Sequence, residues 1–200
     1  MKKSLNILFL TVMATSIGGA GYGATLRADR AYVAQDHEDF LVLASQQQTL
    51  SIFLTGYSFW DNTPPGSAAI ARPVIHGSAG GTGTYGDPIT IAVGYSLASG
   101  SARLDFPAGT RFYLPALQRY AIVEDICGDG PTPELTGCHQ GRGGLPWLDI
   151  YVDGRRSGPG QANQCMNRIT GRHQVIINPK KGYPVVAGPL TESGCGVLTN

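Results

Sequence analysis

Short apolar runs broken by glycine and proline are the feature that most restricts how this chain can fold. Glycine and proline account for 41 of the 200 residues (28 + 13), and both residue types favour turns over long helices. The runs with the length and composition of strands are 50–57, 89–95, 111–114, 119–124, 148–152, 173–177 and 183–186. Helical periodicity is weak after Thr49. The pattern predicts a mainly β protein, a small barrel with long loops and little helix.

The N-terminus has the organisation of a secretory signal peptide. Lys2 and Lys3 precede an apolar stretch at 5–17, and small residues follow as far as Ala24. The apolar stretch is too short to span a bilayer. We therefore expect a signal peptide at 1–24, cleaved between Ala20 and Ala24, and a protein that is secreted or periplasmic.

Two parts are expected after the signal peptide. Residues 25–48 form a polar extension with a short helix around 36–44, and residues 49–200 form a single domain with its own core. Removal of two lysines leaves 13 basic residues (15 − 2) against 14 acidic ones, a net charge of −1. We see no basic patch for nucleic acid and no further hydrophobic segment for a membrane. We expect a monomer.

The four cysteines are Cys127, Cys138, Cys165 and Cys195, and all follow the signal peptide. An even number in an oxidising compartment predicts two disulfides. Of the three possible connectivities we favour 127–138 and 165–195, because each closes a loop within its own segment. A zinc site is the alternative, but no CxxC pair is present. We predict no metal and no cofactor.

Aspartates in strand-like runs need an explanation, because an unpaired carboxylate is costly to bury. Asp149 alternates with Leu148 and Ile150, so it should point away from the face that these two residues share. Asp125 closes the run that begins at 119, and its neighbour Glu124 points the other way, as a surface charge would. Cleavage of a sugar bond requires a carboxyl group that holds a proton near neutral pH.

Three segments carry a resemblance to a known family. They are 106–115 (Phe-Pro-Ala-Gly-Thr-Arg-Phe-Tyr-Leu-Pro), 120–128 (Tyr-Ala-Ile-Val-Glu-Asp-Ile-Cys-Gly) and 148–151 (Leu-Asp-Ile-Tyr). They resemble the "P-x-G-T-x-x-Y-I-P", "A-x-x-E/A-D-T-G" and "R-I-D-L-Y" strands of the three-aspartate domain, found in membrane-bound lytic transglycosylase A and in stationary-phase survival muralytic proteins. Expansins and family-45 endoglucanases share its double-psi β-barrel, and 55–61 and 147–150 are similar to two of their strands. The resemblance covers roughly 50–153 and implies a six-stranded double-psi β-barrel.

The resemblance also implies roles for three carboxyl groups. Asp149 would be the general acid, Asp125 a member of the acidic cluster, and Asp61 a base that activates water. Each has a structural alternative, namely a solvent-facing strand position for Asp149 and turn formation for the other two. The family's first aspartate precedes the Pro-x-Gly-Thr strand closely, and here either Asp87, some twenty residues earlier, or Asp105 is its counterpart.

A second set of residues would contact the sugar or the acid. Hydroxyl groups on one strand face can hydrogen bond to the acid, and aromatic faces can stack on pyranose rings. Packing in the barrel is the alternative for each of them. The residues in this set are Thr55, Tyr57, Trp60, Asp87, Trp147 and Tyr151.

The function expected from these patterns is cleavage of β-1,4-glycosidic bonds in a cell-wall polysaccharide, either peptidoglycan or a β-glucan. A lytic transglycosylase would use one carboxyl group and the 6-hydroxyl of the sugar, whereas an inverting hydrolase would use two carboxyl groups. The alternatives are a non-catalytic, expansin-like protein that binds and loosens polysaccharide, and a secreted interaction or defence module.

Overall fold

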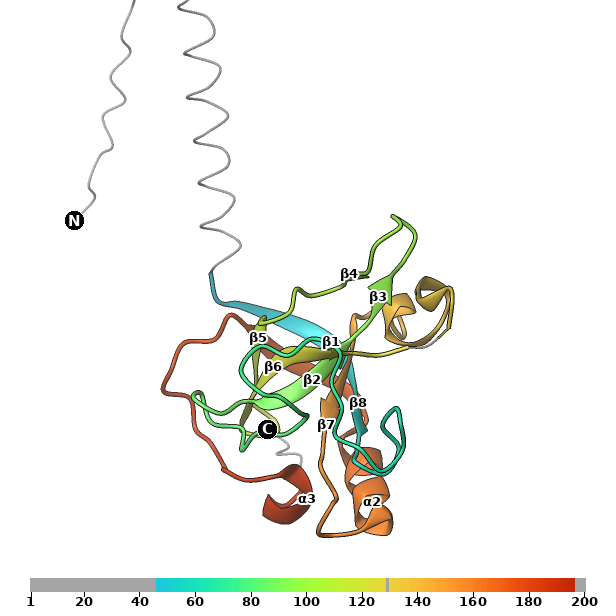
Figure 1. The fold of residues 1–200 in the computed structure, drawn as a ribbon. Helices are drawn as coiled ribbons and strands as arrows, with labels where there is room; N and C mark the ends of the chain where they lie inside the picture. Colours follow the sequence, from blue (N-terminus) through green and yellow to red (C-terminus); the bar gives the residue numbers. More distant parts are fainter. Residues whose placement is uncertain (1–45, 129, 197–200) are drawn as a thin grey trace, which may run out of the picture. The chain divides into compact units, whose positions relative to one another are not determined.

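The computed structural model describes residues 46–128 and 130–196, which form a β-barrel body. As predicted, the fold is mainly β, and its centre is a closed barrel of six strands (Figure 1). Each strand in the barrel pairs with the next one in the order given, and the last pairs with the first. The strands are β1 (Gln48–Tyr57), β7 (Trp147–Tyr151), β2 (Ile89–Val93), β6 (Arg119–Ile126), β5 (Arg111–Leu114) and β8 (Gly171–Ile177).

The barrel mixes parallel and antiparallel neighbours. β1 is parallel to β7 and β2 is parallel to β6, while the other four pairs are antiparallel. The core lies inside the barrel and is made of alternate strand residues; those with no exposed surface include Ile52, Leu54, Ile91, Val93, Leu148 and Ile150. The residues between them point outward. The predicted alternation of Asp149 with its two apolar neighbours is therefore confirmed.

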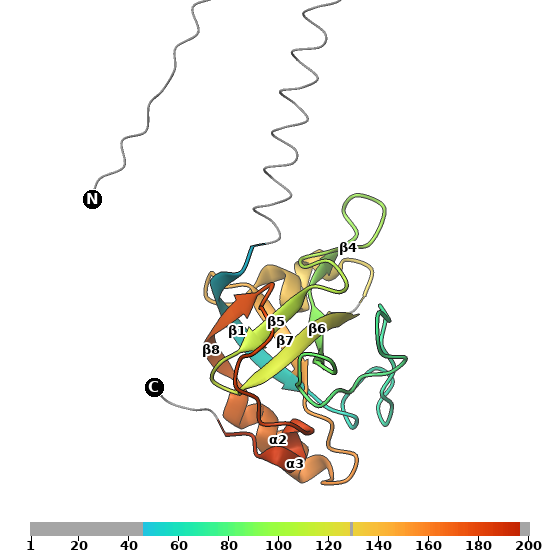
Figure 2. The same ribbon diagram turned by 90° about the vertical axis from the view of Figure 1, so that its left-hand side faces the viewer.

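Shorter elements cover the two ends of the barrel (Figures 1 and 2). The helices α2 (Pro159–Ile169) and α3 (Leu190–Ser193) lie side by side at one end. The other end carries the two-stranded β3 (Tyr95–Ser96) and β4 (Arg103–Leu104), together with the 3-10 turns η1 (Pro133–Leu135) and η2 (Gly137–Gln140).

Two expectations about secondary structure were wrong. The predicted strand at 183–186 pairs with no other strand, because Tyr183 instead stacks its ring on Tyr113 at 4.5 Å and donates its backbone N–H to the Tyr120 hydroxyl at 3.0 Å. Helix α2 was not expected at all. Its buried residues Ala162, Cys165 and Ile169 follow helical spacing with polar residues between them, which is an amphipathic pattern, but Gly158, Pro159 and Gly160 at its start are typical of a turn.

The two disulfides join Cys127 to Cys138 and Cys165 to Cys195, as predicted. The first ties the chain just after β6 to η2, and the second ties α2 to the chain just after α3. No cysteine of the described ranges is free. None of the helices described here is long and apolar enough to cross a membrane.

The predicted signal peptide at 1–24 and the helix around 36–44 lie outside the residues that the structure describes. Of the predicted extension at 25–48, only its last three residues are described, and β1 already begins at Gln48. The single domain at 49–200 stays a prediction.

Candidate functional site

A pocket of about 330 Å³ lies on the outer face of the barrel, over β1, β7, β2 and β6. The register of these strands places Thr55 beside Asp149, Asp149 beside Ala92, and Ala92 beside Asp125. Neighbouring strands lie about 4.8 Å apart, so the Cα atoms of the two aspartates are roughly 10 Å apart. Because the residue between them is an alanine, the surface is hollow there. Thr55, Asp149, Ala92 and Asp125 therefore form one row across four strands.

A bulge in the pairing of β2 with β6 brings Asp125 to this row. Ile91 pairs with Val123, but the next residue of β2, Ala92, pairs with Asp125, so that Glu124 is the extra residue. Without the bulge, strict alternation would turn Asp125 toward the core. A bulge re-aims the residues that follow it, and here it turns the carboxylate of Asp125 into the pocket.

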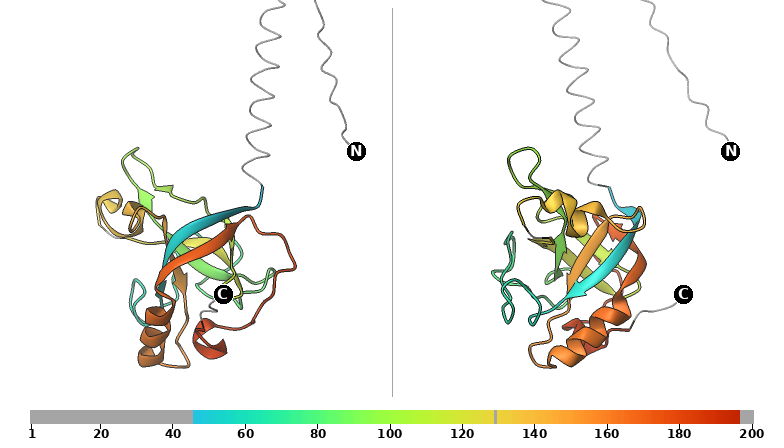
Figure 3. Two further views of the ribbon diagram at one scale, coloured as in Figure 1. Left: turned by 180° about the vertical axis from the view of Figure 1, so that it is seen from behind. Right: turned by 90° about the vertical axis from the view of Figure 1, so that its right-hand side faces the viewer.

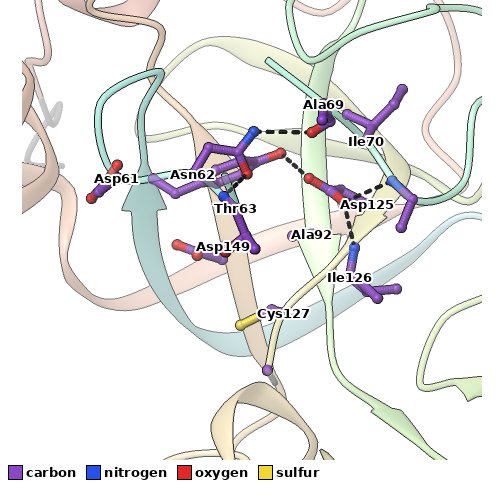
Figure 4. A pocket seen from close by; sticks show the side chains of 13 residues that line it. Asp61, Asn62, Thr63, Ala69, Ile70, Ala92, Asp125, Ile126, Cys127 and Asp149 are labelled. Atoms are coloured by element: carbon purple, nitrogen blue, oxygen red, sulfur yellow. Dashed lines mark hydrogen bonds between the residues drawn. The ribbon is translucent and has the colours of Figure 1, made fainter. Parts of the chain in front are cut away.

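The carboxylate of Asp125 is fully engaged with protein groups (Figure 4). Its Oδ1 accepts the backbone N–H groups of Ala71 at 3.0 Å and Ile126 at 2.9 Å, and its Oδ2 accepts the Tyr57 hydroxyl at 2.9 Å. Burial raises the pKa of Asp125, although these hydrogen bonds oppose the shift. The Tyr57 side chain crosses from β1 toward β6, so this contact ties the two sides of the pocket together.

The loop that follows β1 forms a further wall and carries Asp61. The Oδ1 atom of Asp61 accepts both the backbone N–H and the hydroxyl of Ser58, each at 2.7 Å. The next residue, Asn62, donates its side-chain amide to the carbonyl groups of Ser67 at 3.2 Å and Ala69 at 3.0 Å. These bonds hold the loop in a compact turn. Figure 4 shows Asp61 and Asp149 on one side of the pocket and Asp125 on the other.

Asp149 is the most perturbed acidic group in the pocket. Its Oδ1 accepts the Thr55 hydroxyl at 2.6 Å, and the Thr55 oxygen accepts the indole N–H of Trp147 at 2.8 Å. Desolvation raises the pKa of Asp149 to about 7, and the negative charges of Asp61 and Asp125 add to the shift. The residue keeps some exposed surface, so its carboxyl group is both desolvated by surrounding protein and open to a ligand in the pocket.

The predicted site residues separate into two groups. Asp149, Asp125, Asp61 and Tyr57 line the pocket together, and Cys127 of the first disulfide lines it as well. Thr55 and Trp147 do not line the pocket, but Thr55 hydrogen bonds to Asp149 and Trp147 hydrogen bonds to Thr55. Tyr151 is 2% exposed and packs edge-on against Tyr57, with ring centroids 5.2 Å apart, so it supports the floor rather than offering a surface for sugar.

The other predicted contacts lie outside the lining of this pocket. Trp60 is 39% exposed, but its indole N–H is engaged with the Gly154 carbonyl at 2.8 Å. Asp105 lies beside His139, with Oδ1 and Nδ1 2.5 Å apart. Asp87 accepts the Thr82 backbone N–H at 3.0 Å and lies 2.9 Å from His76 Nε2.

Glu124 was predicted to be a surface charge, and this was wrong. It has no exposed surface, because a loop folds over it and donates the backbone N–H groups of Val74, Ile75 and His76 to its Oε1. The second oxygen, Oε2, lies 2.6 Å from His76 Nδ1. Burial raises the pKa of Glu124, but the hydrogen bonds from His76 and Ile75 outweigh burial and the pKa is lowered.

Local sequence reasoning missed Ala92, Ser58 and Asn62. Ala92 leaves space between Asp149 and Asp125 because its side chain is small. Ser58 and Asn62 form the hydrogen bonds that hold the loop after β1. For Asn62 the available signal was its position before Thr-Pro-Pro, which is typical of a turn. Nothing in the sequence around Ala92 distinguishes it from a core residue. Within the described part of the chain, no group of three or more His, Cys, Asp or Glu residues is placed to hold a metal ion.

The arrangement can donate a proton near neutral pH to a ligand in the pocket. A carboxyl group with a pKa close to the working pH exists in both protonation states, so it can give up a proton and take one back. The three carboxyl groups differ in their environments, and such differences separate acid and base roles.

Comparison with known proteins gives a family model and one curated relative. The model described as the DDB_G0273701 N-terminal domain matches residues 49–196. The protein named "Uncharacterized protein DDB_G0273701/DDB_G0273221" of Dictyostelium discoideum is 45% identical over 132 residues, which is 66% of this chain and 52% of that protein. The chain thus spans about half the length of the relative that it matches. No solved structure matches.

Proposed function

We propose that this chain, which belongs to the DDB_G0273701 N-terminal domain family, cleaves β-1,4-glycosidic bonds of a cell-wall polysaccharide with Asp149 as the general acid. One observation carries the proposal, namely a carboxyl group with a pKa of about 7 in a pocket of about 330 Å³ that it shares with two other aspartates. Such a group can protonate the oxygen of the bond that breaks.

Thr55 and Trp147 would position the acid. The Thr55 hydroxyl occupies Oδ1 of Asp149 at 2.6 Å, and the indole N–H of Trp147 fixes the direction of that hydroxyl. Because Oδ1 is an acceptor in this arrangement, the acidic proton is carried by Oδ2. Strands β1 and β7 are parallel and pair at Thr55 and Asp149. The hydrogen bonds from Trp147 to Thr55 and from Thr55 to Asp149 are therefore formed between paired strands.

The environments of the other carboxyl groups favour a reaction with a single acid. Both oxygens of Asp125 already accept protein hydrogen bonds, so its role is to hold the walls of the pocket. In the reaction we propose, the 6-hydroxyl oxygen of the sugar attacks C1 and the bond from C1 to the leaving oxygen breaks. Asp149 donates its proton to that oxygen and takes up the proton of the 6-hydroxyl, and the product is a 1,6-anhydro sugar.

Inverting hydrolysis is the alternative chemistry for the same pocket. Asp61 uses Oδ1 for its two bonds to Ser58, and its Oδ2 would then activate a water molecule. Water would add to C1, and the product would be a reducing sugar rather than an anhydro sugar. The identity of the product separates the two reactions.

The barrel type and the location are part of the proposal. The six-stranded closed barrel with mixed pairing supports a double-psi barrel of the three-aspartate type, and the motifs quoted above support it further. The two disulfides support an oxidising compartment, as in secreted or periplasmic proteins. We propose polysaccharide as the partner of a monomer.

Mass spectrometry of the products tests the proposal. Wild type, Asp149→Asn, Asp61→Asn and the control Asp105→Asn, which removes a carboxylate outside the pocket, are incubated with peptidoglycan and with soluble β-glucans. We expect anhydro products from wild type, Asp61→Asn and the control, and none from Asp149→Asn. Equal product from wild type and Asp149→Asn would remove Asp149 as the acid.

A non-catalytic, expansin-like role is the second candidate. The observation that favours it is that Asp61 and Asp125 are both held by the protein, which leaves Asp149 as the carboxyl group most available to a ligand. This version predicts that the glycan binds to wild type and that no new chain end appears in the products.

A further inference from the structure

A second row of outward-facing side chains lies next to the row that contains the acid. Across β8, β1 and β7, Arg172 pairs with Phe53, and Phe53 pairs with Trp147. Phe53 and Trp147 lie two residues before Thr55 and Asp149 on their strands, so they share the outer face of the barrel. The separation along the strands is about 6.6 Å, which is close to the length of one sugar unit. Figure 3 (right) shows the three strands side by side.

A fourth residue, Arg142, lies over this row. Its guanidinium carbon is 5.0 Å from the centre of the Phe53 ring and 5.7 Å from that of Trp147, within the range of cation–π attraction. The two rings meet edge-on with centroids 5.7 Å apart. We call the four residues Phe53, Trp147, Arg142 and Arg172 the basic aromatic shelf.

The turn that carries Arg142 is rigid. Arg142 donates its N–H to the Leu145 carbonyl at 2.9 Å and accepts the Leu145 N–H at 3.1 Å. Gly141 has a φ of 67°, and a Cβ atom there would lie 2.4 Å from the Leu145 oxygen, so only glycine fits. The disulfide at Cys138 anchors the chain just before this turn. The backbone at Arg142 is therefore fixed beside the two rings, and the cation–π contacts favour a guanidinium that lies over them.

Both arginines of the shelf are exposed, and neither forms an ion pair within 46–128 and 130–196. Phe53 and Trp147 are partly exposed. Two cations beside two aromatic rings, on an area of this size, match a ligand unit that has an apolar face and a negative charge. A pyranose with a carboxylate group has both properties.

The shelf and the acid are joined by hydrogen bonds. The indole N–H of Trp147 binds Thr55 Oγ1 at 2.8 Å, and Thr55 binds Asp149 at 2.6 Å. A sugar unit on the shelf would therefore adjoin a unit in the pocket. Resting on the function proposed above, we propose that the shelf binds an acidic sugar unit next to the bond that is cleaved, so that the substrate is a β-1,4-linked glycan with carboxylate groups.

Calorimetric binding of two hexasaccharides tests this inference. One is β-1,4-linked glucuronic acid, and the other is its neutral counterpart cellohexaose. The protein carries Asp149→Asn so that no glycan is cut, alone or together with Arg142→Gln, Arg172→Gln, or the control Arg168→Gln, which removes an exposed arginine of α2. Urea unfolding of each variant verifies that it folds.

We expect the acidic glycan to bind about tenfold more tightly than the neutral one, with a preference that weakens as salt is added. Arg142→Gln and Arg172→Gln should each remove most of that preference and leave cellohexaose binding within about twofold, since they remove charge and not ring surface. Arg168→Gln should change neither affinity.

Equal affinity for the two glycans, a preference unaffected by either shelf variant, or no binding of either glycan would overturn the inference. Cleavage is measured separately with wild type. The substrates for cleavage are peptidoglycan and soluble β-glucans, whose sugar units keep the 6-hydroxyl that glucuronic acid lacks. If the acidic glycan binds selectively and wild type releases no product from these substrates, the proposed catalytic function fails while the shelf stands as an acidic-glycan site.

Discussion

Replacing Asp149 by asparagine should make the protein more stable at neutral and alkaline pH. Desolvation raises the pKa of Asp149 from an ordinary 3.8 to about 7. Between these values the folded state binds more protons than the unfolded state, so the free energy of unfolding decreases as the pH rises through this window. The favourable contribution of the protonated carboxyl is complete below pH 3.8 and lost above about pH 7.

The size of the effect follows from the shift. The difference between about 7 and 3.8 is about 3 units, and each unit corresponds to about 1.36 kcal/mol. Ionised Asp149 therefore lowers the free energy of unfolding by at most about 4 kcal/mol, and screening by water at the mouth of the pocket reduces this to about 2–4 kcal/mol. Asparagine keeps the shape and still accepts the Thr55 hydroxyl, so the variant avoids the penalty without losing the contact.

Urea unfolding of wild type and Asp149→Asn, at pH values from about 4 to 8, measures the effect. Groups common to both proteins, such as His76, cancel when the two free energies of unfolding are subtracted. The variant should gain progressively on wild type as the pH rises, with most of the gain in place by about pH 7. Asp105→Asn removes a carboxylate outside the pocket that contacts His139, so this variant should not gain stability over wild type as the pH rises. A difference that stays constant across this range would refute a raised pKa for Asp149.

Three further predictions concern the pocket, the buried pair and the disulfides. Ala92→Leu should fill the pocket and abolish glycan binding, measured by calorimetry, at a cost of about 1–3 kcal/mol in stability; unchanged binding would show that the ligand lies elsewhere. Burial lowers the pKa of His76. The hydrogen bonds of its ring to Glu124 and to Asp87 outweigh burial, so the pKa is raised. His76→Gln should therefore destabilise the protein by about 2–3 kcal/mol in urea unfolding near pH 6 and by less near pH 9, because the stabilisation is lost as the pH rises through that pKa; equal losses at both pH values would contradict the charged pair. Serine at both Cys165 and Cys195 should cost about 4 kcal/mol, more than the roughly 3 kcal/mol for the other disulfide, because their closed loop spans 30 residues against 11; the reverse order in urea unfolding would refute the loop-entropy argument.

Local patterns in the sequence were sufficient for several features. The alternation of Leu148, Asp149 and Ile150 depends only on strand geometry, so the outward direction of Asp149 was predictable. The disulfide pairing followed from short loops within each segment. The mainly β barrel followed from short apolar runs between turns. Helix α2 was missed, although its buried residues have helical spacing, because Gly158, Pro159 and Gly160 at its start are typical of a turn.

Strand pairing decided the site. Asp125 reaches the pocket because of a bulge opposite Ala92, and a bulge is a property of two paired strands that neither sequence shows alone. Asp61 and Asp149 both line the pocket, whereas Asp87 lies instead beside His76. The motif resemblance named all three, but it could not show which of them meet.

The sequence by itself determined that Asp149 points out of the barrel and which cysteines can join, since these depend on neighbours along the chain. Only the tertiary structure decided that Glu124 is buried and that Arg142 lies over Phe53 and Trp147. The pKa of Asp149 was decided in the same way, because desolvation and the charges of distant aspartates raise it. Burial and charge interactions depend on distances in space, and in this barrel they join residues that are far apart along the chain.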